Sequence, residues 1–409
     1  MSDLEVTSAF SIDINDLSVV RMVTDLIEHA LRSRASDIHL EPLQHEVRIR
    51  LRIDGVLINI AHVPLEHHVG LVSRLKILAG MNIVERRRPQ DGQFSTTVDG
   101  RDVDVRLASV STVFGEKLVL RLLDKNRTTK GLSDLGMPSE TSRLFSDLVR
   151  SPFGMVICAG PTGAGKTTTL YASLLELDAE SKNITTIEDP VEYIFSGINQ
   201  IKTNEQAGLT FASGLRALLR QDPDVILVGE IRDPDTARLA VQAAHTGHLV
   251  LSSLHATDAA AALYRLLEMD IEAFLVASSV IGVVGQRLLR RNCSYCLEPY
   301  EPSSTEIDFL RSNDLHQHEV FGATDQITLW RSSGCPICDG TGYHDRIGIY
   351  EVLRVTPRIR SLVISHTATE DIRTVAREEG MRPLIFGAAD LIARGVTTVN
   401  EAIRTLYRS

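Results

Sequence analysis

The sequence lacks an excess of basic residues. Its 409 residues include 43 lysines and arginines against 53 aspartates and glutamates, which gives a formal net charge of −10. Proteins dedicated to nucleic acid generally present a broad basic face. Strands that interleave basic and aromatic residues are also missing, and aromatic residues make up only 5% of the chain. The composition therefore argues against nucleic acid as the main partner.

Long hydrophobic runs and a secretion signal are also missing. The longest apolar run, Phe274–Gly285, is too short and too interrupted to cross a bilayer, so we expect it to form a buried helix. The N-terminal stretch does not combine positive charge, an apolar core and a small-residue cleavage site, and we expect no signal peptide. Five cysteines without such a signal favour a reducing compartment, where metal binding is more common than disulfides. These absences predict a cytoplasmic protein.

The most informative segment that is present runs from Met155 to Leu170. Five apolar or small residues lead into the pattern Gly-x-x-x-x-Gly-Lys-Thr, and a helix-forming run follows. This strand–loop–helix context is typical of a phosphate-binding loop. Glycines let successive backbone N–H groups point at phosphate oxygens, and the helix N-terminus adds positive charge. The residues predicted to hold a nucleoside triphosphate are Gly160, Pro161, Thr162, Gly163, Ala164, Gly165, Lys166, Thr167 and Thr168.

Two side chains of this loop have specific expected tasks. Lys166 is placed to reach the β- and γ-phosphates, and the Thr167 hydroxyl is placed to bind Mg²⁺. A glycine-rich turn with a chance lysine is the simpler interpretation, but the flanking elements favour ATP.

The rest of the chain divides by its hydrophobic patterns. Helical spacing at 19–34 and near 65–80, with strand alternation at 37–41, 46–53 and 95–123, predicts a small α+β domain. Later apolar runs at 155–159, 184–187, 225–228 and 249–254 alternate with helical patterns, as in a doubly wound parallel sheet. The expected organisation is an α+β domain (1–125), a linker (126–137), an α/β nucleotide-binding core (138–290), a cysteine-bearing insert (291–345) and a helical C-terminal region (346–409).

Polar residues follow three of the predicted strands. Glu188 follows the run at 184–187, Glu230 follows the run at 225–228, and His248 and His255 bracket the run at 249–254. Ligands bind at the carboxyl ends of parallel strands. A carboxylate there suits the attacking water or the Mg²⁺ shell, and a histidine can sense the γ-phosphate. We expect Glu188 to be the general base, with Glu230 as its competitor. A solvated cap or a structural histidine is the alternative for each residue.

The cysteines form two C-x₂-C pairs. Four thiolates in this pattern suit tetrahedral Zn²⁺, although the 38 residues between the pairs exceed the short-finger range. A redox or reactive-thiol role is the alternative. Cys158, in the strand before the phosphate loop, is expected to be a small buried hydrophobe. The predicted zinc ligands are Cys293, Cys296, Cys335 and Cys338.

Several long motifs resemble one family. They comprise residues 34–42, 160–169, 186–193, 208–233 and 246–258. Together they are similar to the secretion ATPase superfamily and, more narrowly, to the type II secretion and type IV pilus assembly ATPases (GspE/PilB-like). The resemblance covers the chain from about residue 17 to its end. It matches Glu188 to the family's acidic box, Glu230 to its Walker B motif, and His248 to His255 to its histidine box.

The resemblance implies a RecA-like ATPase domain preceded by a small α+β (PAS-like) domain, with a zinc-bound insert. It implies a homo-hexamer that hydrolyses ATP with Mg²⁺ and drives an inner-membrane secretion or pilus platform, with membrane association through partners only. It also implies that first-domain arginines close over the nucleotide, and Arg101 and Arg106 lie in the matching segment. A solvated basic strand face is the alternative for these two arginines.

Other outcomes stay open. Family members usually carry a further N-terminal domain that docks on the platform. The sequence starts without it, either as a truncated piece or as a short natural variant. Within the family, pseudopilus assembly in type II secretion is the expected function and type IV pilus extension is the alternative. A RecA-like nucleic-acid motor and a nucleotide-binding scaffold without turnover are the alternatives from other classes.

Overall fold

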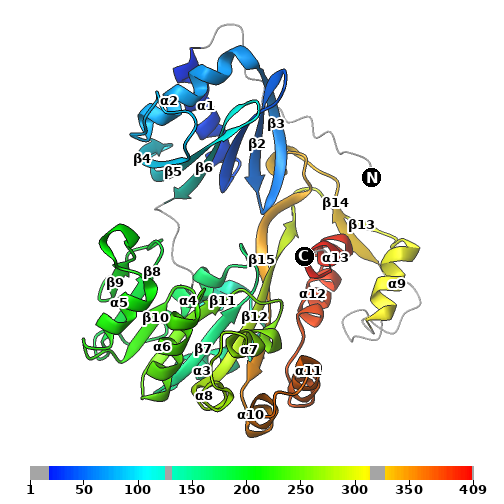
Figure 1. Ribbon diagram of the computed structural model, residues 1–409. Helices are drawn as coiled ribbons and strands as arrows, with labels where there is room; N and C mark the ends of the chain where they lie inside the picture. Colours follow the sequence, from blue (N-terminus) through cyan, green and yellow to red (C-terminus); the bar gives the residue numbers. More distant parts are fainter. Residues whose placement is uncertain (1–17, 125–130, 314–327, 408–409) are drawn as a thin grey trace. The chain divides into compact units, whose positions relative to one another are not determined.

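The computed structural model describes residues 18–124, 131–313 and 328–407 (Figure 1). The chain forms two compact units. Of the described residues, the first contains 18–124, 292–298 and 332–345, and the second contains the remainder. Part of the predicted linker, residues 126–130, lies outside the described residues. Its later part contains the short 3₁₀ helix η2 (Leu132–Leu135).

The first unit is built on a six-stranded sheet with the strand order β3-β2-β1-β6-β5-β4, in which the neighbouring strands run antiparallel. The Asp54-Gly55 turn joins β2 to β3 with positive φ at both residues, as a tight two-residue hairpin requires. The helices and strands predicted here are confirmed. The elements are α1 (Val19–Arg32), β1 (Asp37–Pro42), β2 (Glu46–Ile53), β3 (Val56–Pro64), η1 (Leu65–His67), α2 (His68–Leu78), β4 (Gln90–Val98), β5 (Arg101–Thr112) and β6 (Gly115–Asp124).

One face of this sheet is apolar and the other is charged. Val47, Ile49 and Leu51 alternate along β2 and share a core with buried residues of α1 and α2. The intervening arginines of β2 lie on the opposite face, where Glu41 accepts hydrogen bonds from Arg48 and Arg50. The period of two in the sequence therefore sets which face packs against the helices.

The second unit contains a seven-stranded sheet with the order β15-β12-β7-β11-β10-β8-β9. The pairs β12–β7, β7–β11, β11–β10, β10–β8 and β8–β9 are parallel, as predicted for a doubly wound sheet. The strands are β7 (Gly154–Ala159), β8 (Ile184–Glu188), β9 (Asn199–Lys202), β10 (Val225–Val228), β11 (Leu249–Leu254), β12 (Val280–Asn292) and β15 (Tyr343–Arg354), the last two of which extend into the first unit.

Helices cover both faces of this sheet (Figure 1). On one face α3 (Ser139–Val149) and α4 (Lys166–Leu174) enclose a core with residues of β7 and β10. The other face packs against six helices: α5 (Phe211–Leu218), α6 (Pro234–His245), α7 (Ala259–Leu267), α8 (Ala273–Ser279), α10 (Pro357–Ile364) and α11 (Thr369–Glu378). All residues of β7, β8, β10 and β11 are buried. Side chains that bind a ligand are therefore expected just beyond the ends of these strands.

One expectation from the sequence is wrong, and the boundary of a second differs in the structure. The run at 274–285 is helical only through Ser279, and from Val280 onward it is β12, because the β-branched residues that follow favour a strand beside β7. The region at 346–409 does not begin as a helix either. Its first residues belong to β15, and the helices that follow include α12 (Leu384–Ala393) and α13 (Val399–Leu406). No helix within the described ranges is long and apolar enough to span a bilayer.

The remaining elements are short. They are η3 (Glu205–Ala207), β13 (Leu297–Tyr300), α9 (Ser304–Ser312), β14 (Leu329–Ser332) and η6 (Pro336–Cys338), and β13 pairs with β14. Leu310 of α9 shares a small core with Leu329 of β14 and Ala388 of α12.

Candidate nucleotide site and cysteine cluster

The loop between β7 and α4 has the backbone that its glycines predict. Gly163 and Gly165 both adopt positive φ, which glycine tolerates without strain. Gly160 is restricted by space, since a Cβ there would lie 2.7 Å from the carbonyl oxygen of Gln286 and 2.9 Å from Ala164 Cβ. Thr167 and Thr168, in the first turn of α4, are exposed. A hydroxyl and backbone N–H groups are therefore available at a helix N-terminus, where anions bind.

Lys166 folds back over this loop. Its Nζ donates to the carbonyl oxygens of Gly160 at 2.9 Å and Pro161 at 3.0 Å. Burial lowers the pKa of the Lys166 ammonium, and the charge of Arg287 acts in the same direction, whereas Glu230 opposes both. An ammonium held by neutral carbonyls gains charge-assisted hydrogen bonds when phosphate oxygens come within reach.

Glu230 and His255 lie near Lys166 at the carboxyl edge of the sheet. The Glu230 carboxylate is partly exposed and accepts a 2.5 Å hydrogen bond from Arg232. Burial and the Lys166 charge lower the pKa of His255, while Glu230 opposes that shift. A neutral imidazole can both donate and accept hydrogen bonds. The structure therefore brings Lys166, Glu230 and His255 together around the loop.

Glu188 has a different environment. It is only 3% exposed, and its carboxylate accepts hydrogen bonds from the Tyr171 hydroxyl, from the Thr186 hydroxyl at 2.5 Å and from the Gln200 amide at 3.3 Å. Tyr171 lies on α4, five residues after Lys166. Three donors fix the direction of this buried carboxylate. The sequence analysis identified Glu188 but none of these three donors.

His248, predicted to sense the nucleotide phosphate, does not lie beside the phosphate loop of this chain. His248 precedes β11, and its carbonyl accepts from the N–H of Gly154 at the start of β7. The phosphate loop follows the end of β7, and a strand rises about 3.3 Å per residue, so His248 lies at the opposite edge of the sheet. Its Nδ1 is 2.9 Å from the Ala243 carbonyl, which is a structural contact at the end of α6.

Arg101 and Arg106 both lie on β5 of the first unit. Because they are five residues apart on a regularly paired strand, they project to opposite sides of the sheet. Arg106 is directly opposite Arg121 of β6 and shares its face. This neighbouring pair of cations was missed from the sequence, because it depends on strand register.

Strand β12 supplies two polar residues that sequence reasoning also missed. Gln286 Nε2 donates to the Ala164 carbonyl at 2.6 Å, so it supports the phosphate loop directly. Arg287 follows it and is 6% exposed. The signal for both was present in the sequence, since Gln286-Arg287 interrupts the apolar run from Val280 to Leu289.

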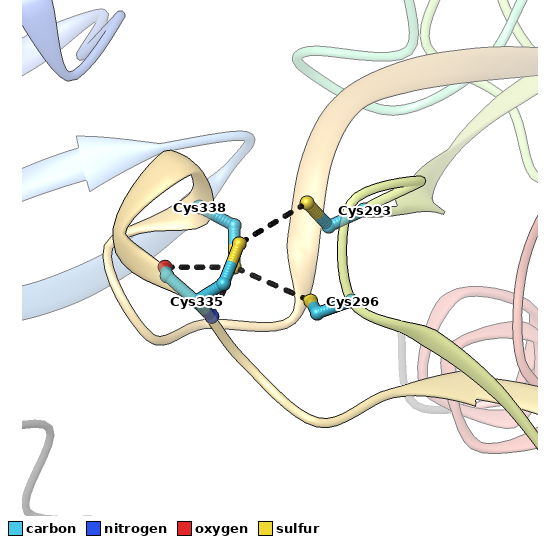
Figure 2. A group of neighbouring side chains, drawn as sticks. All are labelled: Cys293, Cys296, Cys335 and Cys338. Atoms are coloured by element: carbon cyan, nitrogen blue, oxygen red, sulfur yellow. Dashed lines mark hydrogen bonds between the residues drawn. The ribbon is translucent and has the colours of Figure 1, made fainter.

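The four clustered cysteines converge on one point (Figure 2). Their sulfur atoms all lie within 4.8 Å of one another, with Cys293–Cys335 at 3.8 Å and Cys296–Cys338 at 3.9 Å. Four thiolates bound to Zn²⁺ at about 2.3 Å place their sulfurs about 3.8 Å apart, so this donor set fits zinc. Burial opposes ionisation of the Cys335 thiol, but backbone N–H groups of Cys338 and Ile337 outweigh it and lower its pKa to about 7.

Cys158 lies apart from this cluster. It is fully buried in β7, and burial raises the pKa of its thiol to about 12. A thiol in this state stays protonated at neutral pH and packs as a small apolar group, as the sequence predicted.

Fold and site together define a P-loop nucleotide-binding protein whose parallel sheet places an acid and a histidine beside the phosphate loop. A family profile described as "Type II/IV secretion system protein" matches residues 13–404. The chain belongs to this family, and the resemblance inferred from its motifs is confirmed.

Individual relatives agree with this assignment. The chain is 45% identical to the type II secretion system protein HxcR of Pseudomonas aeruginosa, over 94% of this chain and 77% of the relative. It is 41% identical to the type II secretion system ATPase E of Vibrio cholerae, over 97% and 76% of the two chains. It is also 41% identical to the type IV pilus assembly ATPase TfpB of Acinetobacter baylyi, over 96% and 66%.

A solved structure supports the fold. The Legionella pneumophila ATPase DotB matches with a TM-score of 0.67 at 18% identity, over 95% of this chain and 96% of DotB. The predicted α/β fold class is thereby confirmed.

Proposed function

We propose that this chain is a Mg²⁺-dependent ATPase whose turnover powers pseudopilus assembly in type II protein secretion. The observation that carries the proposal is the grouping of Lys166, Glu230 and His255 around a glycine loop at a helix N-terminus. Relatives named as secretion and pilus ATPases are 41% identical to this chain over nearly its whole length.

Each group at the loop has a proposed task. Lys166 and the loop N–H groups hold the phosphates, and Thr167 and Glu230 would hold Mg²⁺, which would supply positive charge for the transferred phosphoryl group. Glu188 is the proposed general base that takes a proton from the attacking water, and its three hydrogen-bond donors set its direction. His255, held neutral beside Lys166, is the proposed sensor of the γ-phosphate.

Arginine from a neighbouring copy completes the proposed site. Arg101 and Arg106 are the candidates, and a trans arginine accelerates phosphoryl transfer by about 10³–10⁵. This arrangement requires a closed ring, for which we propose a homo-hexamer. The partner of the ring is the inner-membrane secretion platform, which places the chain at the cytoplasmic side of that membrane through its partners. Cys293, Cys296, Cys335 and Cys338 are proposed to hold a structural Zn²⁺.

A mixing experiment tests both the active site and the shared arginines. Phosphate release is measured for Lys166→Ala, for Arg106→Ala and for their mixture, with magnesium and ATP. Each variant alone is expected to be inactive, while the mixture regains activity because intact loops meet intact arginines. A mixture as inactive as its components contradicts the shared site. Equal rates for the parent chain, Lys166→Ala and Glu230→Gln would remove the enzyme proposal and leave a nucleotide-binding scaffold.

Type IV pilus extension is the second candidate, because a pilus assembly ATPase is among the relatives at 41% identity. Binding assays against the cytoplasmic loops of secretion and pilus platform proteins separate the two functions. A nucleic-acid motor is disfavoured by the net charge of −10, and salt-sensitive stimulation of phosphate release by DNA would revive it.

A further inference from the structure

Strand β12 places a buried arginine beside the phosphate loop. The Arg287 guanidinium donates through Nη1 to the Gln286 carbonyl at 2.9 Å and through Nη2 to the Thr257 carbonyl, while its Nε has no hydrogen-bond acceptor in the described part of the chain. All of its acceptors are therefore neutral. Burial lowers the pKa of Arg287, but an arginine keeps its charge at any ordinary pH.

The acidic residues nearest to Arg287 are engaged elsewhere. Glu351 accepts from the backbone N–H groups of Ala259 and Leu384, and Asp258 caps α7 and pairs with Arg373 at 2.8 Å. Their charges oppose the lowering of the Arg287 pKa, but neither carboxylate forms an ion pair with the guanidinium in the described part of the chain. A buried cation without an ion-pair partner is unfavourable unless a further anion compensates it.

The position of Arg287 indicates which anion this is. A Cβ on Gly160 would lie 3.5 Å from Arg287 Nη1, so the guanidinium lies against the first residue of the phosphate loop. The charge of Arg287 also reaches Lys166 on the same loop. Two cations, Lys166 and Arg287, thus lie beside a loop whose N–H groups suit an anion, and Arg287 forms no direct ion pair among the described residues. A polyphosphate is the anion that satisfies both.

Arg287 also links two parts of the site. Its Nη2 holds the carbonyl of Thr257, which is two residues after His255. The same side chain therefore lies beside the start of the phosphate loop and donates a hydrogen bond to the segment that follows β11. Arg287 is thus able to set the distance between the proposed γ-phosphate sensor and the loop.

We propose that Arg287 is a nucleotide-positioning residue, which supplies positive charge to the bound triphosphate from the β12 side and holds the His255 segment against the loop. This inference rests on the proposed function, since it requires a triphosphate in the loop. Arg287 differs from Arg101 and Arg106, the arginines proposed to act from a neighbouring copy, because it belongs to the same unit as the phosphate loop.

The test compares Arg287→Gln, Arg287→Lys and the control Arg354→Gln, which removes an exposed arginine at the end of β15. The affinity of each purified full chain for a fluorescent ATP analogue is measured with magnesium, together with its melting temperature without nucleotide. We expect Kd to rise about tenfold for Arg287→Gln and about threefold for Arg287→Lys, with no change for the control. The corresponding increase for an ADP analogue is smaller, because it carries one phosphate fewer.

The two readouts separate positioning from a purely structural role. Loss of a buried charge that makes no ion pair is expected to leave the melting temperature of the nucleotide-free protein unchanged or higher. A lower melting temperature with an unchanged Kd would overturn the inference and make Arg287 structural. An unchanged Kd in a parent chain that binds ATP overturns only this inference, whereas a parent chain that binds no ATP overturns the proposed function as well.

Discussion

Replacing Tyr171 by phenylalanine removes the hydroxyl, which is one of the three donors to Glu188, and leaves the aromatic ring in place. The ring packs edge-on against Phe195 with centroids 4.9 Å apart and against Tyr193 at 6.0 Å, and phenylalanine keeps both contacts. The hydroxyl donates to the buried Glu188 carboxylate and accepts from the backbone N–H of Glu192 at 3.1 Å. The variant therefore isolates the effect of the hydroxyl.

The expected loss follows from the charge of the acceptor. A hydrogen bond to a charged group contributes about 1.5–3 kcal/mol, against about 0.5–1.5 kcal/mol for a neutral pair. Tyr350→Phe is the matched control, because the Tyr350 hydroxyl is also buried but donates to the neutral carbonyl of Leu135 at 3.2 Å. Tyr171→Phe is expected to lower the free energy of unfolding by about 2 kcal/mol and the control by about 1 kcal/mol.

Urea unfolding followed by far-ultraviolet circular dichroism measures this difference, and phosphate release measures its effect on turnover. If Glu188 is the base, its displacement in Tyr171→Phe lowers kcat about tenfold, which is about 1.4 kcal/mol in the barrier, while Tyr350→Phe keeps the parent rate. Equal stability losses in the two variants, with kcat unchanged in both, would refute the argument that Tyr171 holds Glu188 in place.

Three further predictions concern other parts of the chain. Metal analysis is expected to find one zinc per parent chain and none in Cys296→Ser, with faster hydrogen exchange at 292–298 and 332–345 in the variant; zinc retained by the variant would contradict the four-thiolate site. In the first unit, burial opposes ionisation of Glu41, but Arg50, Lys117 and Arg48 outweigh it and lower its pKa to about 2. Because this pKa lies below the unfolded value of 4.5, the stabilisation of about 3 kcal/mol is complete above pH 4.5 and is lost as the pH falls toward 2. Urea unfolding should therefore separate the parent from Glu41→Gln at pH 6 and bring them together near pH 2, and a gap that does not change with pH would speak against the ion cluster. His255→Ala is expected to reduce phosphate release at least tenfold while His248→Ala changes it less than twofold, because only His255 lies at the edge of the loop; equal effects would contradict that placement.

The sequence alone predicted the features that depend on local patterns. The apolar runs of β7, β8, β10 and β11 and the alternation of β2 were sufficient for the strands, since period and burial are written in consecutive residues. The phosphate loop and the cysteine pairs were found for the same reason. Their spacing is a local requirement of the chemistry.

Features that depend on packing between distant segments could not be predicted in this way. His248 and His255 look equivalent in the sequence, and only the direction of β11 separates them by the length of a strand. Gln286 and Arg287 reach the loop because β12 pairs with β7, and that pairing joins residues more than 120 positions apart. Two donors to Glu188 likewise come from other elements, Tyr171 from α4 and Gln200 from β9.

Phosphate release by the purified chain with magnesium and ATP, compared with Lys166→Ala, tests the central claim most directly. The Lys166 ammonium lies against the carbonyls of Gly160 and Pro161 in the phosphate loop. Its loss therefore removes the main charge contact with the phosphates. We expect sustained, magnesium-dependent release by the parent chain and a rate at least a hundredfold lower for the variant, about 3 kcal/mol in the barrier. A parent chain that releases no phosphate, or a variant that matches it, would contradict the account.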